Sequence, residues 1–166
     1  MVIVAFVAVL IAAGCRPQKP VEKPPVVVAA GDIAVCRTEG DEATAKLVEG
    51  IDGATVLTLG DNAYPDGSAE DFEECYEPTW GRHKERTRPS VGNHEYYTPE
   101  ASGYFDYFGS AAGDPKKGYY SYDRGSWHIV ALNSNCKEVG GCEWRSTQGH
   151  WLRRDLDRHR ARCTLA

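Results

Sequence analysis

Two short apolar runs, each followed by an aspartate, most constrain how this chain folds. Residues 26–31 and 54–60 are rich in valine and leucine and have the length of buried strands. Asp32 follows the first run and Asp61 follows the second. Between the two runs, residues 41–50 begin with acidic side chains and end in a glycine, which is typical of a helix. We therefore expect a βαβ unit, a parallel strand pair with a right-handed crossover, and an α/β fold.

The rest of the chain predicts further short elements in both classes. We expect helices over 68–75, 100–108 and 147–161 (the last capped by Ser146 or Thr147), and strands over 88–91, 118–123, 127–133 and 163–166. The strands 118–123 and 127–133 are separated by Arg-Gly-Ser, which favours a tight hairpin.

The last predicted helix is amphipathic and carries a basic run. We expect Trp151, Leu152 and Leu156 to pack inwards, while the arginines, Asp155 and Asp157 face water. The arginines of 153–162 also fit a patch for nucleic acid or anionic lipid. Because the chain of 166 residues has a net charge of −5, nothing in its overall charge favours a nucleic-acid partner.

The N-terminus resembles a bacterial lipoprotein signal. Residues 2–13 are apolar but too short for a comfortable membrane span, and the run leads into Ala-Ala-Gly-Cys, which resembles a lipobox ending at Cys15. Ala12 replaces the usual leucine, and no basic residue precedes the run; a plain secretory signal or a buried N-terminal segment also fits. We expect a signal peptide over 1–15, a Pro-rich tether over 16–25, and one domain over 26–166. The predicted location is extracytoplasmic, as a membrane-anchored lipoprotein or a secreted protein.

An exported location permits disulfides among the remaining cysteines. Cys136 and Cys142 flank a Gly-Gly turn, so a bridge that closes this short loop is plausible. Cys36 and Cys75 each follow a loop with candidate site residues and could pair, although spacing alone fixes no connectivity. We expect Cys163 to be a buried thiol.

The candidate site consists of carboxylates, an amide, a phenol and an imidazole. Asp32 and Asp61 follow strands of the expected parallel pair, at the sheet edge where α/β proteins bind ligands. Tyr64 stands three residues after Asp61, and Asn93-His94 lies on a later loop. Such oxygen- and nitrogen-rich sets suit metals that polarise phosphate. Each residue alone also fits a cap, a turn or ordinary packing; three motifs in this order favour the metal site. The aromatic residues of 96–108 fit a pocket wall or, more simply, the core.

The three motifs read Gly31-Asp32, Gly60-Asp61-Asn62-Ala63-Tyr64 and Gly92-Asn93-His94-Glu95. In these motifs the chain resembles the calcineurin-like metallophosphoesterases, and within that family the purple acid phosphatase-like branch. The resemblance implies the first half of an αββα sandwich with a mixed sheet and flanking helices. It also implies two divalent or mixed-valence metal ions (Fe, Zn or Mn). Asp32 would bind the first, Asp61 would bridge both, Asn93 would bind the second, and Tyr64 would be a tyrosinate ligand. His94 would act on the substrate phosphate or the leaving group.

The sequence also departs from this family. The first motif reads Asp32-Ile33-Ala34 where the broad superfamily has Asp-x-His, a histidine that the purple acid branch also lacks. The later Gly-His-x-His motif is absent from the sequence, so we expect a fragment that carries about half of the site. The predicted function is metal-dependent hydrolysis of phosphate esters. The alternative is a non-catalytic, lipid-anchored binding protein with a degenerate site.

Overall fold

The computed structural model describes residues 25–166. The expected signal peptide, the lipidation site Cys15 and nearly all of the expected tether lie outside these residues. The strands are β1 Val27–Ala30, β2 Ala34–Val35, β3 Thr55–Thr58, β4 Ala63–Tyr64, β5 Thr87–Arg88, β6 Tyr120–Arg124, β7 Trp127–Ala131 and β8 Cys163–Leu165. The α-helices are α1 Gly40–Glu49, α2 Ala69–Asp71, α3 Ser102–Phe108 and α4 Thr147–Arg158. Within 25–166, no helix combines the length and the apolar character needed to cross a membrane.

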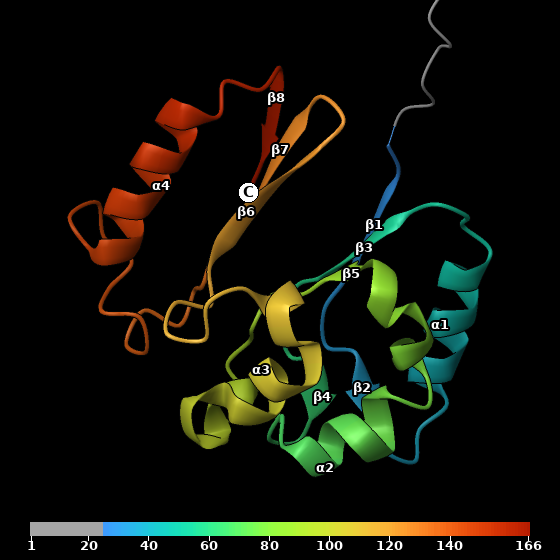
Figure 1. Ribbon diagram of the computed structural model, residues 1–166. Coiled ribbons are helices and arrows are strands. Elements are labelled where there is room, and N and C mark those ends of the chain that lie inside the picture. Colours follow the sequence, from blue (N-terminus) through green and yellow to red (C-terminus); the bar gives the residue numbers. More distant parts are fainter. Residues whose placement is uncertain (1–24) are drawn as a thin grey trace, which may run out of the picture.

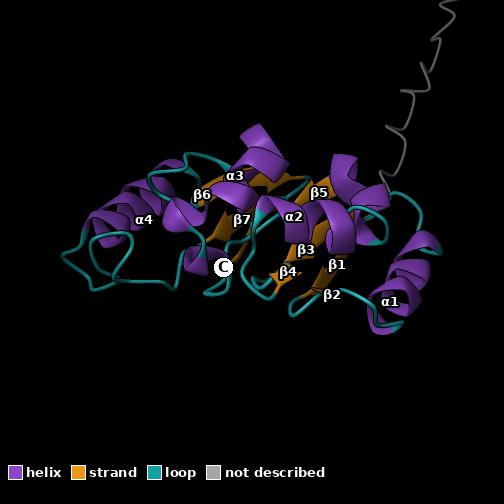
Figure 2. Cartoon of the chain, turned by 90° about the horizontal axis from the view of Figure 1, so that it is seen from below, coloured by secondary structure: helices purple, strands orange, loops and turns teal. Residues whose placement is uncertain are grey.

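The fold is α/β, as the sequence pattern predicts, and its strands form three sheets. β1, β3 and β5 make a parallel sheet in the order β1-β3-β5, and the short strands β2 and β4 pair in parallel. The helix α1 connects β1 and β2 to β3, so the expected βαβ unit with a parallel pair is confirmed. Figure 1 shows α1 and α4 at opposite ends of the molecule with the strands between them, and Figure 2 gives the same arrangement from below.

The third sheet contains the predicted hairpin. β6 and β7 are antiparallel, with Arg124 opposite Trp127 across the tight turn. β8 then pairs with β7 in parallel, so this sheet is mixed. The hairpin and the short last strand are confirmed, within one or two residues of the expected limits.

An aromatic cluster forms the core on the helical side of the first sheet. Phe72, Tyr76, Tyr104 and Phe108 are each at most 5% exposed, and the centroids of rings in contact lie 5.2–6.5 Å apart. The predicted segment 68–75 forms α2 continued by a π-helical turn, Phe72–Tyr76, which directs the rings of Phe72 and Tyr76 inwards, while α3 supplies the other two. Burial of large rings is the main stabilising term here, at about 1.5–3 kcal/mol for each side chain. The simpler interpretation of the aromatic segment, core packing, therefore holds for Tyr104 and Phe108.

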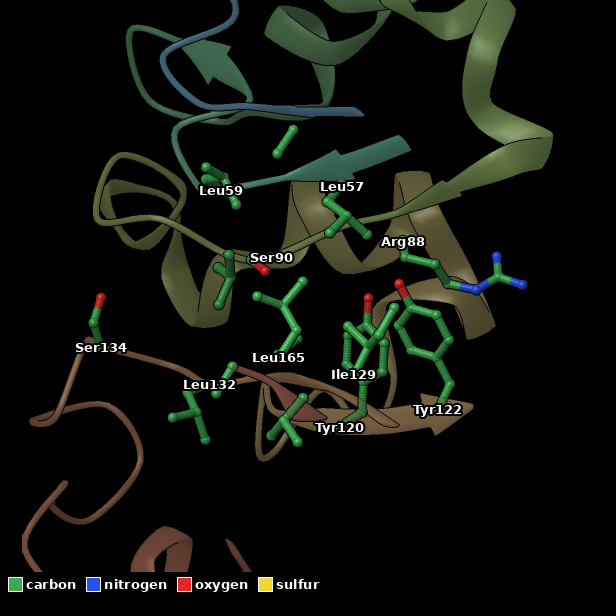
Figure 3. A pocket seen from close by; sticks show the side chains of 15 residues that line it. Leu57, Leu59, Arg88, Ser90, Tyr120, Tyr122, Ile129, Leu132, Ser134 and Leu165 are labelled. Carbon is green, nitrogen blue, oxygen red and sulfur yellow. The ribbon is translucent and has the colours of Figure 1, made fainter. Parts of the chain in front are cut away.

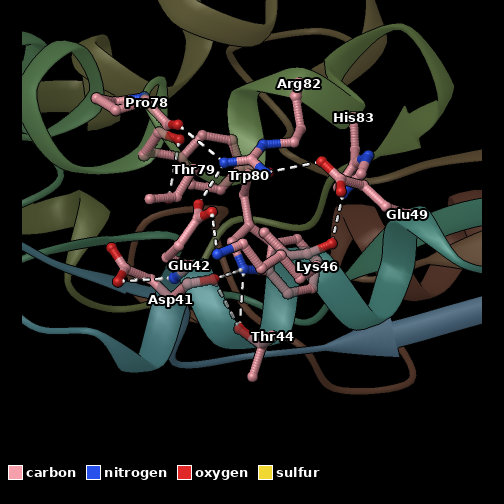
Figure 4. Close-up of polar contacts among 12 residues, drawn as sticks. Asp41, Glu42, Thr44, Lys46, Glu49, Pro78, Thr79, Trp80, Arg82 and His83 are labelled. Carbon is pink, nitrogen blue, oxygen red and sulfur yellow. Dashed lines mark hydrogen bonds and ion pairs between the residues drawn. The ribbon is translucent and has the colours of Figure 1, made fainter.

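One buried tryptophan joins α1 to the 3₁₀ helix Trp80–Arg86 (Figure 4). The indole Nε1 of Trp80 donates to the carbonyl oxygen of Asp41 at 3.1 Å. Arg82 adds ion pairs to Glu42 and Glu49 at the surface. Because exposed ion pairs contribute only about 0–1 kcal/mol, the buried indole stabilises this junction more than the arginine does.

The predicted N-cap of α4 is confirmed, but two predictions about which α4 side chains are buried are wrong. The Ser146 hydroxyl accepts a hydrogen bond from the backbone N–H of Gly149, as an N-cap does. Asp155 does not face water: it is 8% exposed, because Ser121 and His128 of the hairpin both bind its carboxylate. Leu156 does not pack inwards and is 40% exposed. The polar partner on the hairpin turns Asp155, not Leu156, towards the sheet.

Candidate metal centre

The two aspartates of the candidate site lie side by side at one edge of the parallel sheet. Residues Ala30 and Thr58 end β1 and β3 in register; Gly31-Asp32 follows β1 directly, and Gly60-Asp61 follows β3 after Leu59. The backbone N–H of Asp32 donates to the carbonyl oxygen of Gly60 at 3.3 Å, which keeps the two loops together beyond the strands. The prediction that both carboxylates lie at the same edge of the sheet is therefore confirmed.

Both aspartates adopt an unusual backbone conformation. Asp32 has φ of 52° and Asp61 has φ of 49°, in the left-handed region that residues with a Cβ seldom occupy. Such a conformation costs on the order of 1 kcal/mol or more per residue and persists only where the surroundings impose it. Two strained aspartates in equivalent positions indicate a site that holds its carboxylates in a fixed direction.

Tyr64 brings a third oxygen to the aspartates. Its hydroxyl donates to Asp32 Oδ1 at 2.5 Å and lies 3.3 Å from Asp61 Oδ2. Burial, together with the hydrogen bond and the charge of Asp32 and the charge of Asp61, raises the pKa of Tyr64 well above its usual value. In the described chain, no arginine or lysine forms an ion pair with either carboxylate. Three converging oxygens with an excess of negative charge are a donor set that fits a hard cation.

The third motif meets the second through a glycine contact. An added Cβ on Gly92 would lie 2.1 Å from both the backbone nitrogen and Oδ1 of Asp61, which no side chain could occupy. Because position 92 has no side chain, the loop approaches closely enough for the backbone N–H of His94 to donate to Asp61 Oδ1 at 3.0 Å. The glycine therefore brings the His94 loop onto the Asp61 carboxylate.

His94 is oriented by a carbonyl group and a ring contact. Its Nδ1 lies 2.5 Å from the carbonyl oxygen of Pro65, and its ring centroid lies 4.4 Å from that of Tyr64. A carbonyl oxygen can only accept a hydrogen bond, so Nδ1 carries the proton and the other ring nitrogen, Nε2, is the one able to exchange protons. The contacts to Pro65 and Tyr64 thus fix the orientation of the His94 ring.

Asn93 is exposed, and no hydrogen bond of its side-chain amide is found within residues 25–166. Its backbone oxygen accepts from the N–H of Tyr96 at 3.2 Å. The structure thus brings Asp32, Asp61, Tyr64 and His94 together. Asn93 lies beside His94 in the sequence, but its side chain makes no hydrogen bond to the other site residues.

Glu95 has a role that the sequence interpretation missed. Its side chain is fully buried and accepts hydrogen bonds from the backbone N–H groups of Asn62 and Gly92, both at 2.6 Å, and of Asp61 at 3.2 Å. Burial raises the pKa of this carboxyl group, while the hydrogen bonds from Gly92 and Asn62 oppose that effect. Glu95 therefore joins the two loops that carry Asp61 and His94. The only indication in the sequence was the position of this carboxylate inside the third motif.

Two disulfide bonds connect segments of the domain. Cys36 is bonded to Cys75, with 4.7 Å between Cα atoms, and this bond ties the segment after β2 to the π-helical turn. Cys136 is bonded to Cys142 with a Cα separation of 5.1 Å, closing the loop before α4. Cys163 is a free, half-buried thiol.

Within residues 25–166, a second group of side chains with metal-ligand chemistry lies between the hairpin and α4. It consists of His128, Asp155 and His159, whose ligand atoms lie within 4.8 Å of one another. The two imidazole rings are stacked, with centroids 4.4 Å apart and planes 11° from parallel. A metal lies in the plane of each imidazole that binds it, at about 2.0–2.1 Å, and two nearly parallel planes share no such point. Moreover, both nitrogens of His128 already contact carboxylates, of Asp123 and Asp155, at 2.7 Å.

This cluster is better described as an ion-pair network. Burial would lower the pKa of His128, but its hydrogen bonds to Asp155 and Asp123 outweigh burial and raise it. A protonated imidazole between two carboxylates joins β7 to β6 and α4.

Neither a protein-family model nor a curated protein sequence matches this chain.

A cavity of about 410 Å³ between the two larger sheets does not include the aspartates (Figure 3). Leu57 and Leu59 contribute from one sheet, and Tyr120, Ile129 and Leu165 from the other. Arg88 also lines this cavity, but the rest of its lining is mostly apolar and none of the candidate metal ligands contributes to it, so the polar loops remain the candidate site.

Proposed function

We propose that the Asp32–Asp61–Tyr64 cluster is the acidic part of a two-metal centre that hydrolyses phosphate esters. The observation that carries the proposal is the convergence of three oxygens: the Tyr64 hydroxyl is 2.5 Å from Asp32 and 3.3 Å from Asp61. The resemblance to purple acid phosphatase-like metallophosphoesterases in these motifs supports the same assignment. Metals such as Fe, Zn or Mn, bound as a pair, would polarise the phosphoryl group and lower the pKa of a bound water.

Each residue of the candidate site has a defined role in this proposal. Asp32 would hold one metal, Asp61 would be shared, and Asn93 would turn its amide oxygen towards the second metal. Tyr64 would lose its hydroxyl proton on binding a metal. His94, held through Nδ1 by the carbonyl of Pro65 at 2.5 Å, would present Nε2 to the substrate phosphate or protonate the leaving oxygen.

The donor set also limits what the chain does alone. Asp32, Asp61, Tyr64 and Asn93 offer four side chains to two metals, and none is an imidazole. Two metals held this way are under-coordinated, so the 166-residue chain should bind metal weakly and turn over slowly. This low ligand count also favours the second candidate, a non-catalytic binding protein that keeps the fold with a degenerate site. In either case the proposed location is extracytoplasmic, with the domain anchored to a membrane or secreted.

The test is hydrolysis of p-nitrophenyl phosphate and bis-p-nitrophenyl phosphate with Mn²⁺, Zn²⁺ or Fe. The 166-residue chain is compared with a chain whose reading frame continues through histidine-bearing segments. In the longer chain, we expect His94→Ala to reduce turnover by ~10²–10⁴-fold while metal is retained. Asp61→Asn should abolish both. Full turnover by Asp61→Asn would refute the assigned site, and a frame without further histidines would favour the binding protein.

A further inference from the structure

A basic surface lies at the end of the molecule formed by the β6–β7 turn and the segment that follows α4. These two segments enclose an open cavity of about 350 Å³. Its charged lining residues are Arg158, Arg160, Arg162, His159 and Asp123. The indole of Trp127 also lines the cavity and is 39% exposed. We refer to Arg158, Arg160, Arg162 and Trp127 as the basic face.

The arginines of the basic face are available to an external anion. Arg158, Arg160 and Arg162 are all exposed, and none of them is in an ion pair within residues 25–166. The one carboxylate that lines the cavity, Asp123, already accepts a hydrogen bond from His128 at 2.7 Å. In a chain with a net charge of −5, this local excess of positive charge stands out and is complementary to an anionic surface.

The basic face lies where the N-terminal segment enters the domain. Pro25, the first described residue, lines a small cavity together with Arg124 and Trp127 of the β6–β7 turn. Figure 1 shows the start of β1, this turn and the connection from α4 to β8 at the same end of the molecule. Whatever holds the N-terminus therefore also lies on the side of the basic face.

The length of the N-terminal segment restricts how far the domain can move from a membrane. The chain from Cys15 to Pro25 can span at most about 33–36 Å even when fully extended. A globular domain of this size is roughly 35–40 Å across. If Cys15 or the apolar run before it is held in a bilayer, the tether is too short for the domain to turn its opposite end to the lipid.

We propose that the basic face docks on an anionic phospholipid surface, with the arginines against lipid phosphates and Trp127 in the headgroup region. Arginine pairs well with phosphate groups, and tryptophan is favoured at membrane interfaces. The proposal rests on the N-terminal anchoring inferred from the sequence, and it does not depend on the proposed phosphoesterase activity. Docking fixes the orientation of the anchored domain.

Fluorescence quenching by brominated lipids tests this docking. The full chain is reconstituted through its N-terminal segment into phosphatidylcholine vesicles with or without phosphatidylglycerol, the lipids being brominated. Quenching should be stronger with phosphatidylglycerol, and Trp127→Phe should remove the difference. Trp144→Phe is the matched control, because Trp144 is 71% exposed but lies in the loop before α4, at the opposite end of this helix from the basic face. It should leave the difference intact.

Charge variants provide the second comparison. Each arginine near an anionic bilayer contributes about a fivefold factor in binding, so Arg160→Gln/Arg162→Gln should weaken docking by about 25-fold and reduce quenching to the phosphatidylcholine level. The control Arg37→Gln/Arg145→Gln removes two exposed arginines from other loops and should have no effect. Equal quenching in neutral vesicles, or a control as impaired as the test variant, would overturn the proposal. Quenching abolished by inorganic phosphate would overturn it in favour of a pocket for a single phosphate. A chain that does not associate with phosphatidylglycerol vesicles at all would also overturn it.

Discussion

Glu95 should be the residue on which the geometry of the candidate site depends most. In Glu95→Ala, the backbone N–H groups of Asn62 and Gly92 lose acceptors that lie at 2.6 Å, and that of Asp61 loses one at 3.2 Å. Hydrogen bonds to a charged group contribute about 1.5–3 kcal/mol each, so the two short ones alone predict a loss of ~3–6 kcal/mol. Since a domain of this kind is stable by roughly 5–15 kcal/mol, this variant should be close to unfolding.

Urea denaturation with the disulfides intact measures this effect. Glu95→Gln keeps one oxygen but presents an NH₂ group to N–H donors, so it should fall between Glu95→Ala and the unchanged chain. The control is Glu74→Ala, an exposed glutamate of the π-helical turn, which should change the free energy of unfolding by less than ~0.5 kcal/mol. A Glu95→Ala chain within 1 kcal/mol of the unchanged one, on the order of a single weak hydrogen bond, would refute this reasoning.

Three further predictions concern the hairpin and the cysteines. The pKa of His128 is raised in the folded chain, so the stability it contributes is fully present below its unfolded value of 6.5 and is lost as the pH rises through the higher folded value. The free-energy difference between the unchanged chain and His128→Gln should therefore shrink at alkaline pH; a pH-independent difference would rule this out. Peptide mapping without reductant should recover Cys136 and Cys142 as one linked fragment, and two alkylatable thiols would contradict the bond. Labelled palmitate should enter the chain and be absent from Cys15→Ser; label retained in the variant would disprove lipidation there.

Local sequence patterns were sufficient for much of the fold. The βαβ unit, the hairpin and the cap of α4 follow from apolar runs, turn residues and a serine, all of which act within a few positions. The placement of Asp32 and Asp61 followed as well, because the ends of neighbouring parallel strands share one edge.

Contacts between distant segments could not be predicted in this way. Glu95 binds backbone groups more than thirty positions away. Because every residue except proline has a backbone N–H, the sequence does not show which of these groups Glu95 binds. Asp155 faces inwards because His128 and Ser121 of the hairpin meet it, whereas helical periodicity alone grouped it with the exposed arginines. In both cases a buried polar contact, rather than an apolar one, decides the orientation.

The central claim is that Asp61, not the histidine cluster, holds metal. The metal content of the longer chain, whose reading frame continues through histidine-bearing segments, tests it most directly when measured after equilibration with Mn²⁺ or Zn²⁺ and gel filtration. We predict that Asp61→Asn lowers the metal content, while His159→Ala, which removes an exposed member of the rival His128–Asp155–His159 cluster, leaves it unchanged. Metal lost from His159→Ala and retained by Asp61→Asn would contradict the claim.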